Sequence, residues 1–296
     1  MKEIVVISGK GGTGKTSVTA SLALLAGRDA VVADCDVDAA DLHLLLAPDA
    51  AVEQPFQGGT LAVVDAAACT GCGACDQACR FEAIVVKDGL AVVDDVDCEG
   101  CGYCARVCSD DAISDVRQTV GHWRSTMCRT GGAMVHAHLG IGADNSGKLV
   151  AKVKAVAREE AGLRNTSLVL VDGAPGVGCP VVSSLSGADL VLLVTEPSVA
   201  GLHDLQRVYQ LVASFKLPAA CILNKSDLHE GLRQEVLAFL AAEDIPLLAE
   251  LPYTTAVPAA LAAGKTMLEW DFSLATTLRA AWQGVLEQLQ QSGRTS

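Results

Sequence analysis

The sequence has no long hydrophobic run. Half of its 296 residues are hydrophobic, yet no stretch approaches the roughly 20 apolar residues that a membrane-spanning helix requires. The N-terminal stretch MKEIVVISGKGG also lacks a signal-peptide pattern, because a glycine-rich loop directly follows its short apolar run. These absences argue against a membrane-spanning or secreted chain and predict a soluble cytoplasmic protein.

Basic residues are scarce. The chain has 22 Lys and Arg against 35 Asp and Glu, a net charge of −13. Nucleic acid and anionic lipid surfaces both need Lys and Arg to neutralise phosphates, so neither is an expected partner. The C-terminal stretch WQGVLEQLQQSGRTS also lacks the basic amphipathic pattern of a membrane-surface helix. The acidity serves either solubility or the docking of a partner.

Cysteine, in contrast, is abundant. Eight of the 12 cysteines lie between positions 69 and 108. The cytosol keeps thiols reduced, so metal ligation explains this density better than disulfides do.

Buried-strand patterns alternate with helical patterns in two parts of the chain. The expected strands are 3–7, 30–34, 167–172, 189–194, 219–224 and 246–252, and the expected helices include 16–26, 201–215 and 273–290. Strands alternating with helices predict a doubly wound, mostly parallel α/β sheet covered on both faces. Residues 1–64 and 118–296 would form this domain.

Residues 65–117 differ in composition and predict an inserted α+β domain. They hold 11 acidic and four basic residues and contain an internal repeat. CTGCGACDQACRFEAI (69–84) aligns with CEGCGYCARVCSDDAI (98–113), 29 residues further on. Two copies of a unit too small to form a core alone are expected to pack as a pseudo-symmetric pair.

A phosphate-binding loop lies between the first expected strand and helix. Gly9-Lys10-Gly11-Gly12-Thr13-Gly14-Lys15-Thr16-Ser17 contains the pattern G-x-x-x-x-G-K-S/T. Backbone N–H groups of such a loop and the helix N-terminus bind phosphate oxygens. Lys15 is expected to reach the β- and γ-phosphates, and the Thr16 hydroxyl to hold Mg²⁺.

The cysteine repeats have a specific spacing. C-x₂-C-x₂-C-x₃-C occurs at Cys69, Cys72, Cys75 and Cys79 and again at Cys98, Cys101, Cys104 and Cys108. It is the run of bacterial two-cluster ferredoxins, in which the fourth cysteine of each run binds the other cluster. The resemblance implies two 4Fe-4S clusters, the first held by Cys69, Cys72, Cys75 and Cys108, the second by Cys98, Cys101, Cys104 and Cys79. Arg80 and Ser109 replace the usual proline after each run, and zinc is the alternative metal.

The loop KGGTGKT resembles the deviant Walker A motif of the ParA/MinD/Mrp superfamily of P-loop ATPases. In that family a lysine at the position of Lys10 reaches the nucleotide of a partner subunit, which implies an ATP-sandwiched homodimer. VVADCDVDAADL (31–42) resembles switch I, with Asp36 orienting the attacking water and Asp34 near Mg²⁺. VLVDGAPGVG (169–178) resembles Walker B and switch II, with Asp172 holding a Mg²⁺-bound water and Gly176 sensing the γ-phosphate.

The same resemblance bears on the nucleotide base. Asn224 in ILNKSDL (222–228) would contact adenine, although N-K-x-D is also the guanine-reading signature of GTPases. Lys10 and both switches favour ATP. LPYTTAVPAALAAGK (251–265) resembles the family's segment after the last strand and receives no chemical role.

Four other cysteines and a histidine pair are weaker candidates. Cys179 follows Asp172 at the offset of a cluster ligand in the nitrogenase iron protein, so it is a speculative extra ligand, although a buried structural cysteine is favoured. Cys128 is a weaker candidate of the same kind, and Cys35 and Cys221 are expected in the core. His136 and His138 are expected to be a surface-facing pair rather than metal ligands.

Three functions fit these patterns. The first is an ATPase, with Lys10, Lys15 and Asp36 as catalytic residues, that couples dimer switching to electron transfer through the two clusters. The second is an ATPase for assembly of iron–sulfur or other metal cofactors. The third, a MinD-like positioning ATPase, would leave the clusters unexplained. The expected partners are a second copy and an unidentified redox or cluster-acceptor protein.

Overall fold

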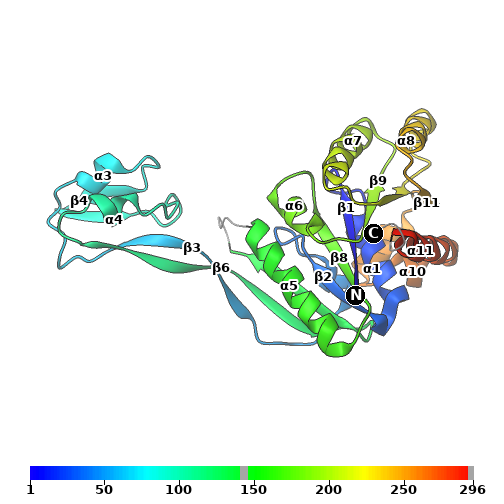
Figure 1. Cartoon of the computed structure of the whole chain (residues 1–296), viewed down its shortest axis with the longest axis horizontal. Helices are drawn as coiled ribbons and strands as arrows, with labels where there is room; N and C mark the ends of the chain where they lie inside the picture. The colour runs from blue at the N-terminus through cyan, green and yellow to red at the C-terminus, as the bar shows by residue number, and fades with distance from the viewer. Residues whose placement is uncertain (141–145, 293–296) are drawn as a thin grey trace. The chain divides into compact units, whose positions relative to one another are not determined.

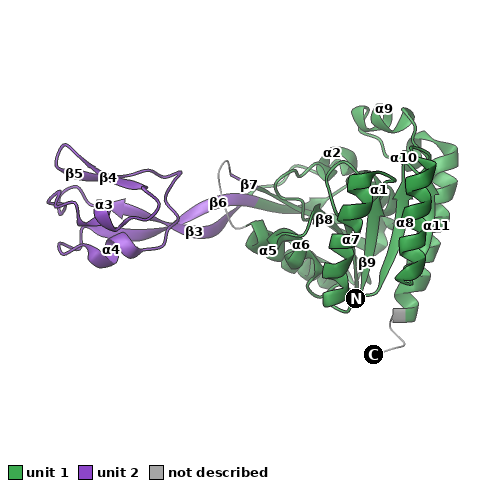
Figure 2. Cartoon of the chain, turned by 90° about the horizontal axis from the view of Figure 1, so that it is seen from above, with its two compact units in different colours: residues 1–53, 123–138, 146–296 green, residues 54–122, 139–145 purple. Residues whose placement is uncertain are grey.

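The computed structural model describes residues 1–140 and 146–292, and the chain forms two compact units. Unit 1 comprises residues 1–53, 123–138 and 146–296, and unit 2 comprises residues 54–122 and 139–145 (Figure 2). The predicted insertion, 65–117, lies inside unit 2, whose bounds are wider because strands on both sides of the cysteine repeats belong to it.

The sheet of unit 1 has the strand order β11-β10-β9-β1-β8-β2-β7, and β6 follows β7. These strands are β1 (Lys2–Ser8), β2 (Ala30–Asp34), β6 (Ile113–Met127, of which 123–127 belong to unit 1), β7 (Ala133–Leu139), β8 (Leu168–Pro175), β9 (Leu190–Thr195), β10 (Ala219–Asn224) and β11 (Leu247–Leu251). The pairs formed by β1, β2 and β7 to β11 are parallel. The mostly parallel α/β sheet is therefore confirmed.

Helices cover both faces of this sheet, because its strands are apolar on both sides. Alternate residues such as Ile4 and Val6 belong to a core that also contains buried side chains of α1, α2, α10 and α11. In Figure 1, α5, α6 and α7 lie on the other side. The helices of unit 1 are α1 (Lys15–Ala26), the 3₁₀ turn η1 (Gly27–Asp29), α2 (Leu42–Leu46), α5 (Ser146–Arg164), α6 (Cys179–Leu185), α7 (Val199–Ser214), α8 (Glu230–Ala242), α9 (Ala256–Ala262), α10 (Met267–Trp270) and α11 (Phe272–Ser292).

All six expected strands and all three expected helices of the α/β domain are confirmed, within one to three residues at their ends. β6 and β7 were not predicted, because polar residues interrupt both strands and neither has the continuous apolar run of the predicted strands. No helix among the described residues is long and apolar enough to cross a membrane.

The two cysteine repeats of unit 2 fold alike. The unit contains β3 (Gln54–Val64), α3 (Ala74–Ala78), β4 (Ile84–Lys87), β5 (Leu90–Val93), α4 (Tyr103–Val107) and the first part of β6. The helices α3 and α4 each begin after a glycine with positive φ, Gly73 at 80° and Gly102 at 70°. Two equivalent backbone hydrogen bonds join the repeats. The Asp65 N–H donates to the Ala112 carbonyl, and the Asp94 N–H donates to the Ala83 carbonyl.

The hydrophobic core of unit 2 is small and rich in cysteine. Its buried members are Ala62, Cys75, Ile84, Ala91 and Ile113, and five further cysteines pack against them. A core of this size supplies little hydrophobic stabilisation.

A buried ion pair joins β1 to two helices of unit 1. The Lys154 ammonium of α5 lies 2.8 Å from Glu3 Oε1 and donates to carbonyls at the end of α6, those of Ser183, Ser184 and Ser186. Both side chains are 2% exposed. Burial lowers the pKa of Lys154, and the Glu3 carboxylate opposes that change.

Lys154→Met is expected to destabilise unit 1 by about 3 kcal/mol, because it leaves Glu3 and the α6 carbonyls buried with fewer partners. Urea unfolding followed by circular dichroism measures the effect. Lys148→Met, an exposed change on the same helix, should stay within about 0.5 kcal/mol of the native protein. Equal midpoints for the two variants would contradict the role given to this pair.

Candidate functional site

The phosphate-binding loop connects β1 to α1 and is shaped by glycines. Gly12 and Gly14 have φ angles of 77° and 92°, which side-chain-bearing residues rarely adopt. A Cβ on Gly9 would lie 2.3 Å from the Asp204 carbonyl oxygen of α7. This close approach fixes the start of the loop against α7.

Lys15 lies among carboxylates of two neighbouring strands, Asp34 and Asp36 at the end of β2 and Asp172 on β8. Its ammonium is 3.0 Å from Asp172 Oδ1 and 3.3 Å from Asp36 Oδ2. The Thr16 hydroxyl donates to Asp172 Oδ2 at 2.8 Å, and the Thr19 hydroxyl donates to Asp172 Oδ1 at 2.8 Å. Asp34 is fully buried and accepts the N–H groups of Asp36 and Leu42. The predicted magnesium ligands and Lys15 are thus brought together.

Three carboxylates surround Lys15, and the pKa values of Asp34, Asp36 and Lys15 are shifted. Burial and the neighbouring Asp172 raise the pKa of Asp34 well above its usual range. Burial also raises the pKa of Asp36, although Lys15 opposes the rise. Burial alone would lower the pKa of Lys15, but the Asp172 and Asp36 carboxylates raise it. The site therefore carries excess negative charge that a divalent cation would offset.

A cavity of about 620 Å³ lies against this group, a volume within the usual range of ligand pockets. Of the predicted nucleotide-binding residues, its lining includes Gly11, Gly12, Gly14, Lys15, Thr16, Ser17 and Asn224. Gly9, Lys10, Thr13 and Gly176 are not among the lining residues.

Another wall of the cavity is formed by residues that were not predicted to bind a ligand. Six residues between positions 252 and 261 line it: Pro252, Tyr253, Thr254, Val257, Pro258 and Leu261. They fall in the segment 251–265 that resembles the family's segment after the last strand. That resemblance was the available signal, but no polar pattern in it pointed to a ligand.

Lys10 is held within its own chain in this structure. Its ammonium is 2.5 Å from Glu196 Oε1 and 3.4 Å from the Ser198 hydroxyl. Glu196 also binds Lys225 at 2.7 Å, and Lys225 donates to the Gly12 carbonyl. Burial opposes ionisation of Glu196, but hydrogen bonds from the two lysines lower its pKa. Contact of Lys10 with a second subunit requires the release of Glu196.

Two other residues that were predicted to contact the nucleotide, Asn224 and Gly176, form hydrogen bonds within the chain. The Asn224 amide donates to the Thr13 carbonyl at 2.8 Å, and its oxygen accepts the Lys225 N–H at 3.0 Å. Asn224 therefore braces the phosphate-binding loop as well as lining the cavity. The Gly176 N–H donates to the Ser8 carbonyl at 2.9 Å, so it has to leave that bond before it can bind a phosphate.

The eight cysteines of unit 2 gather around two cavities. Cys69, Cys72, Cys75 and Cys108, the first cysteine set, line a cavity of about 20 Å³, the first cavity. Cys79, Cys98, Cys101 and Cys104, the second cysteine set, line one of about 420 Å³, the second cavity. Each fourth cysteine lies with the other repeat's trio, the grouping expected from the ferredoxin resemblance.

The remaining cysteines differ in exposure. Cys35 and Cys221 are fully buried, as expected for core residues. Cys128 is buried, and its thiol contacts the Thr130 hydroxyl and the Gly132 carbonyl. Cys179 is exposed at the start of α6, so the favoured interpretation of a buried structural residue was wrong. It begins the helix because Gly178 precedes it in an extended conformation.

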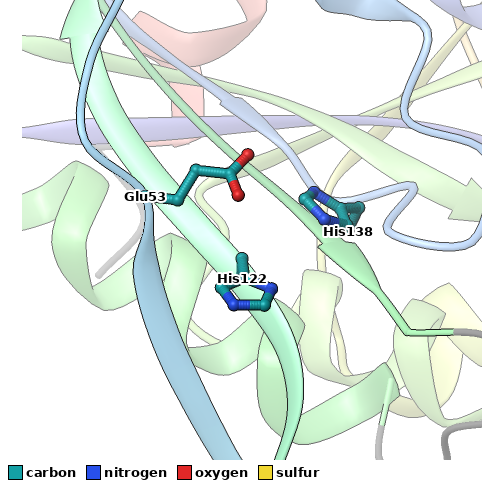
Figure 3. Close-up of side chains that lie close together, drawn as sticks. All are labelled: Glu53, His122 and His138. Carbon is teal, nitrogen blue, oxygen red and sulfur yellow. The ribbon is translucent and has the colours of Figure 1, made fainter.

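The prediction that His136 and His138 both face the surface was wrong for His136. His136 is buried on β7 and stacks on His43, with ring centroids 5.7 Å apart. His138, labelled in Figure 3, is exposed near the end of the same strand. Burial lowers the pKa of His136 to about 4, with smaller contributions from Arg124 and His43.

A protein-family model described as CbiA, the CobQ/CobB/MinD/ParA nucleotide binding domain, matches residues 4–267. The chain belongs to this family. MinD/ParA members of the family are ATPases, and in this chain the glycine-rich loop of the P-loop fold lines the cavity beside Lys15.

Relatives of this MinD-like chain occur in Methanocaldococcus jannaschii. Uncharacterized protein MJ0578 is 31% identical over 77% of this chain and 79% of its own length. Uncharacterized protein MJ0579 is 28% identical over 78% of this chain and 84% of its own length.

A solved structure shares the fold. The septum site-determining protein MinD of Pyrococcus horikoshii, complexed with Mg-ADP, has a TM-score of 0.58 at 19% identity, covering 96% of this chain and 95% of that one. At this identity the likeness shows the fold alone.

Asp36→Asn is expected to retain nucleotide binding but to slow ATP hydrolysis about a hundredfold, because it removes the carboxylate expected to orient the attacking water. Phosphate release under saturating MgATP and nucleotide titration measure the two effects. Asp38→Asn changes an exposed carboxylate on the same cavity wall and should retain most of the activity. Equal loss in both variants would contradict the role of Asp36.

The His136 ring is expected to titrate near pH 4, as the pKa of about 4 implies. Since the unfolded ring titrates near 6.5, the unfolded state binds more protons between these values. Stability from neutral His136 is therefore present above pH 6.5 and is lost as the pH falls toward 4. A histidine-detected NMR titration tests this, and an apparent pKa near 6.5 would contradict the burial of the ring. His138 is the exposed control.

Proposed function

We propose that the protein is a Mg²⁺-dependent ATPase that couples an ATP-sandwiched homodimer to electron transfer through two 4Fe-4S clusters in unit 2. The observation that carries the proposal is the grouping of eight cysteines into two sets of four in a chain that also has a MinD-like nucleotide site.

The residues beside Lys15 suit magnesium and a nucleoside triphosphate. Thr16, Asp34 and Asp172 offer the hydroxyl and carboxylate oxygens that Mg²⁺ prefers, directly or through water. The raised pKa of Asp34 fits a site that is completed by a cation. Bound Mg²⁺ would offset phosphate charge, Lys15 would contact the β- and γ-phosphates, and Asp36 would orient water.

The dimer follows from Lys10. In the single chain its ammonium is bound by Glu196, and we propose that ATP favours its transfer to the nucleotide of a second copy. The resemblance to the MinD solved with Mg-ADP supports the fold in which such a transfer would occur.

The cysteine sets suit iron–sulfur clusters by their chemistry. Each set offers four thiolate ligands, the donor set of a 4Fe-4S cluster. Burial raises the pKa of Cys75 and of Cys104, and neighbouring cysteines of the same run add to each shift. A metal centre bound by the deprotonated cysteines would offset the repulsion between their thiolates. Bound clusters would supply one-electron transfer.

A cofactor-assembly ATPase is the second candidate, and the exposure of Cys179 favours it. This cysteine directly precedes Pro180, which lines the nucleotide cavity. A thiol at that place could bind a transferable metal centre in response to ATP. A positioning role like that of MinD would use neither cysteine set.

Metal analysis and an EPR-monitored redox titration of the anaerobically purified protein test the proposal. We expect about eight iron and eight sulfide per chain. We also expect MgATP to shift at least one midpoint by more than about 30 mV, roughly a threefold change in the equilibrium constant for reduction. Lys10→Ala is the matched control, because it should keep its iron and lose the ATP-dependent shift.

Other outcomes would redirect the assignment. Zinc in place of iron would contradict electron transfer altogether. Intact clusters with unchanged potentials would favour the assembly function, and transfer of iron and sulfide to an acceptor apoprotein that is lost in Cys179→Ser would support it.

A further inference from the structure

The internal repeat allows the two cysteine sets to be compared position by position. Residues 29 apart occupy equivalent places, as α3 and α4 do. Arg80 follows Cys79 and lines the second cavity. Its repeat equivalent is Ser109, which follows Cys108 and carries no charge. The two sites therefore differ in charge at matched backbone positions.

The charged residues around the two cavities confirm a net difference. The second cavity is lined by Arg80 and Glu99, which together have no net charge. The first cavity is lined by Asp110, whose carboxylate accepts the Thr70 hydroxyl at 2.7 Å. Equivalent positions carry Phe81 in place of Asp110 and Thr70 in place of Glu99.

Carboxylates just outside the two linings do not cancel the difference. Asp76 accepts the N–H of Val86, a residue that lines the first cavity. Asp115 lies beside Gly102, which lines the second cavity. These two carboxylates balance each other, so the one-charge difference between the residues that line the two cavities stands.

Arg80 is available to act on the second cavity. It is exposed, and it has no ion pair or hydrogen bond within the described residues. The exposed aromatic side chains of Phe81 and Tyr103 line the same cavity, which is the larger of the two. The Arg80 guanidinium is therefore not held away from this cavity by an ion pair with any described residue.

We propose that Arg80 makes the second cysteine set the site that is reduced first, so that a single electron on unit 2 resides there. This inference rests on the proposed function. Reduction adds one electron, and hence one negative charge, to a cluster site without making or breaking a bond. A nearby cation stabilises the added charge and an anion opposes it, and net charge is among the factors that set cluster potentials.

A charge-exchange series, followed by EPR-monitored redox titration with dithionite as the one-electron reductant, tests the inference. Arg80→Gln should lower the equilibrium constant for reduction at the higher midpoint about tenfold, which is 59 mV for one electron, and should leave the lower midpoint in place. Arg80→Lys should keep the original value. Ser109→Arg, which adds the cation at the equivalent place, should raise the lower midpoint.

Arg117→Gln is the matched control, because it removes an arginine that is exposed in unit 2 and lines neither cavity. It should leave both midpoints unchanged. Full iron content with unchanged midpoints in Arg80→Gln, or with equal shifts at both sites, would overturn this inference alone. Absence of iron from the native protein would overturn the proposed function, and this inference with it.

Discussion

The proposed nucleotide site depends on two carboxylates that the parallel register brings together. Asp34 on β2 and Asp172 on β8 are direct partners in the parallel register, and both are buried. Two buried like charges on neighbouring strands are unfavourable unless a cation lies between them. Lys15 supplies one, and its place at the start of α1 explains why the loop has to turn so sharply through Gly12 and Gly14. The glycines, the first helix and the strand order can thus be understood as means of bringing positive charge to one point.

The sequence predicted the architecture where one local signal sufficed. Continuous apolar runs identified the six central parallel strands, and glycines next to a lysine identified the phosphate-binding loop. Prediction failed where side chains depended on distant partners. The buried place of His136 is set by its neighbours across the sheet and by His43. The hydrogen bond from Gly176 to Ser8 and the hold of Glu196 on Lys10 are long-range contacts that no spacing rule encodes.

The fold of unit 2 is organised around its two cysteine repeats. Its repeats were visible in the sequence because metal-binding runs require a fixed spacing, and the structure brings each fourth cysteine to the opposite trio. The backbone hydrogen bonds of Asp65 and Asp94 hold the two repeats against each other in this arrangement. A duplication would begin with two equal sites, whereas Arg80, Glu99 and Asp110 break the equality at positions outside the cysteine pattern. Under the proposed function, the cysteine spacing decides which metal centre is bound, and the surrounding side chains decide how the two sites differ.

The discontinuity of unit 1 has a consequence for synthesis on the ribosome. β1 and β2 pair with β8, whose residues emerge more than 100 positions later. Residues 54–122 of unit 2, in contrast, are contiguous, and both of their cysteine runs are complete before β8 has been made. Domains generally fold as units while the chain grows. Under the proposed function, the nascent chain could therefore load metal in unit 2 before the proposed nucleotide site has formed.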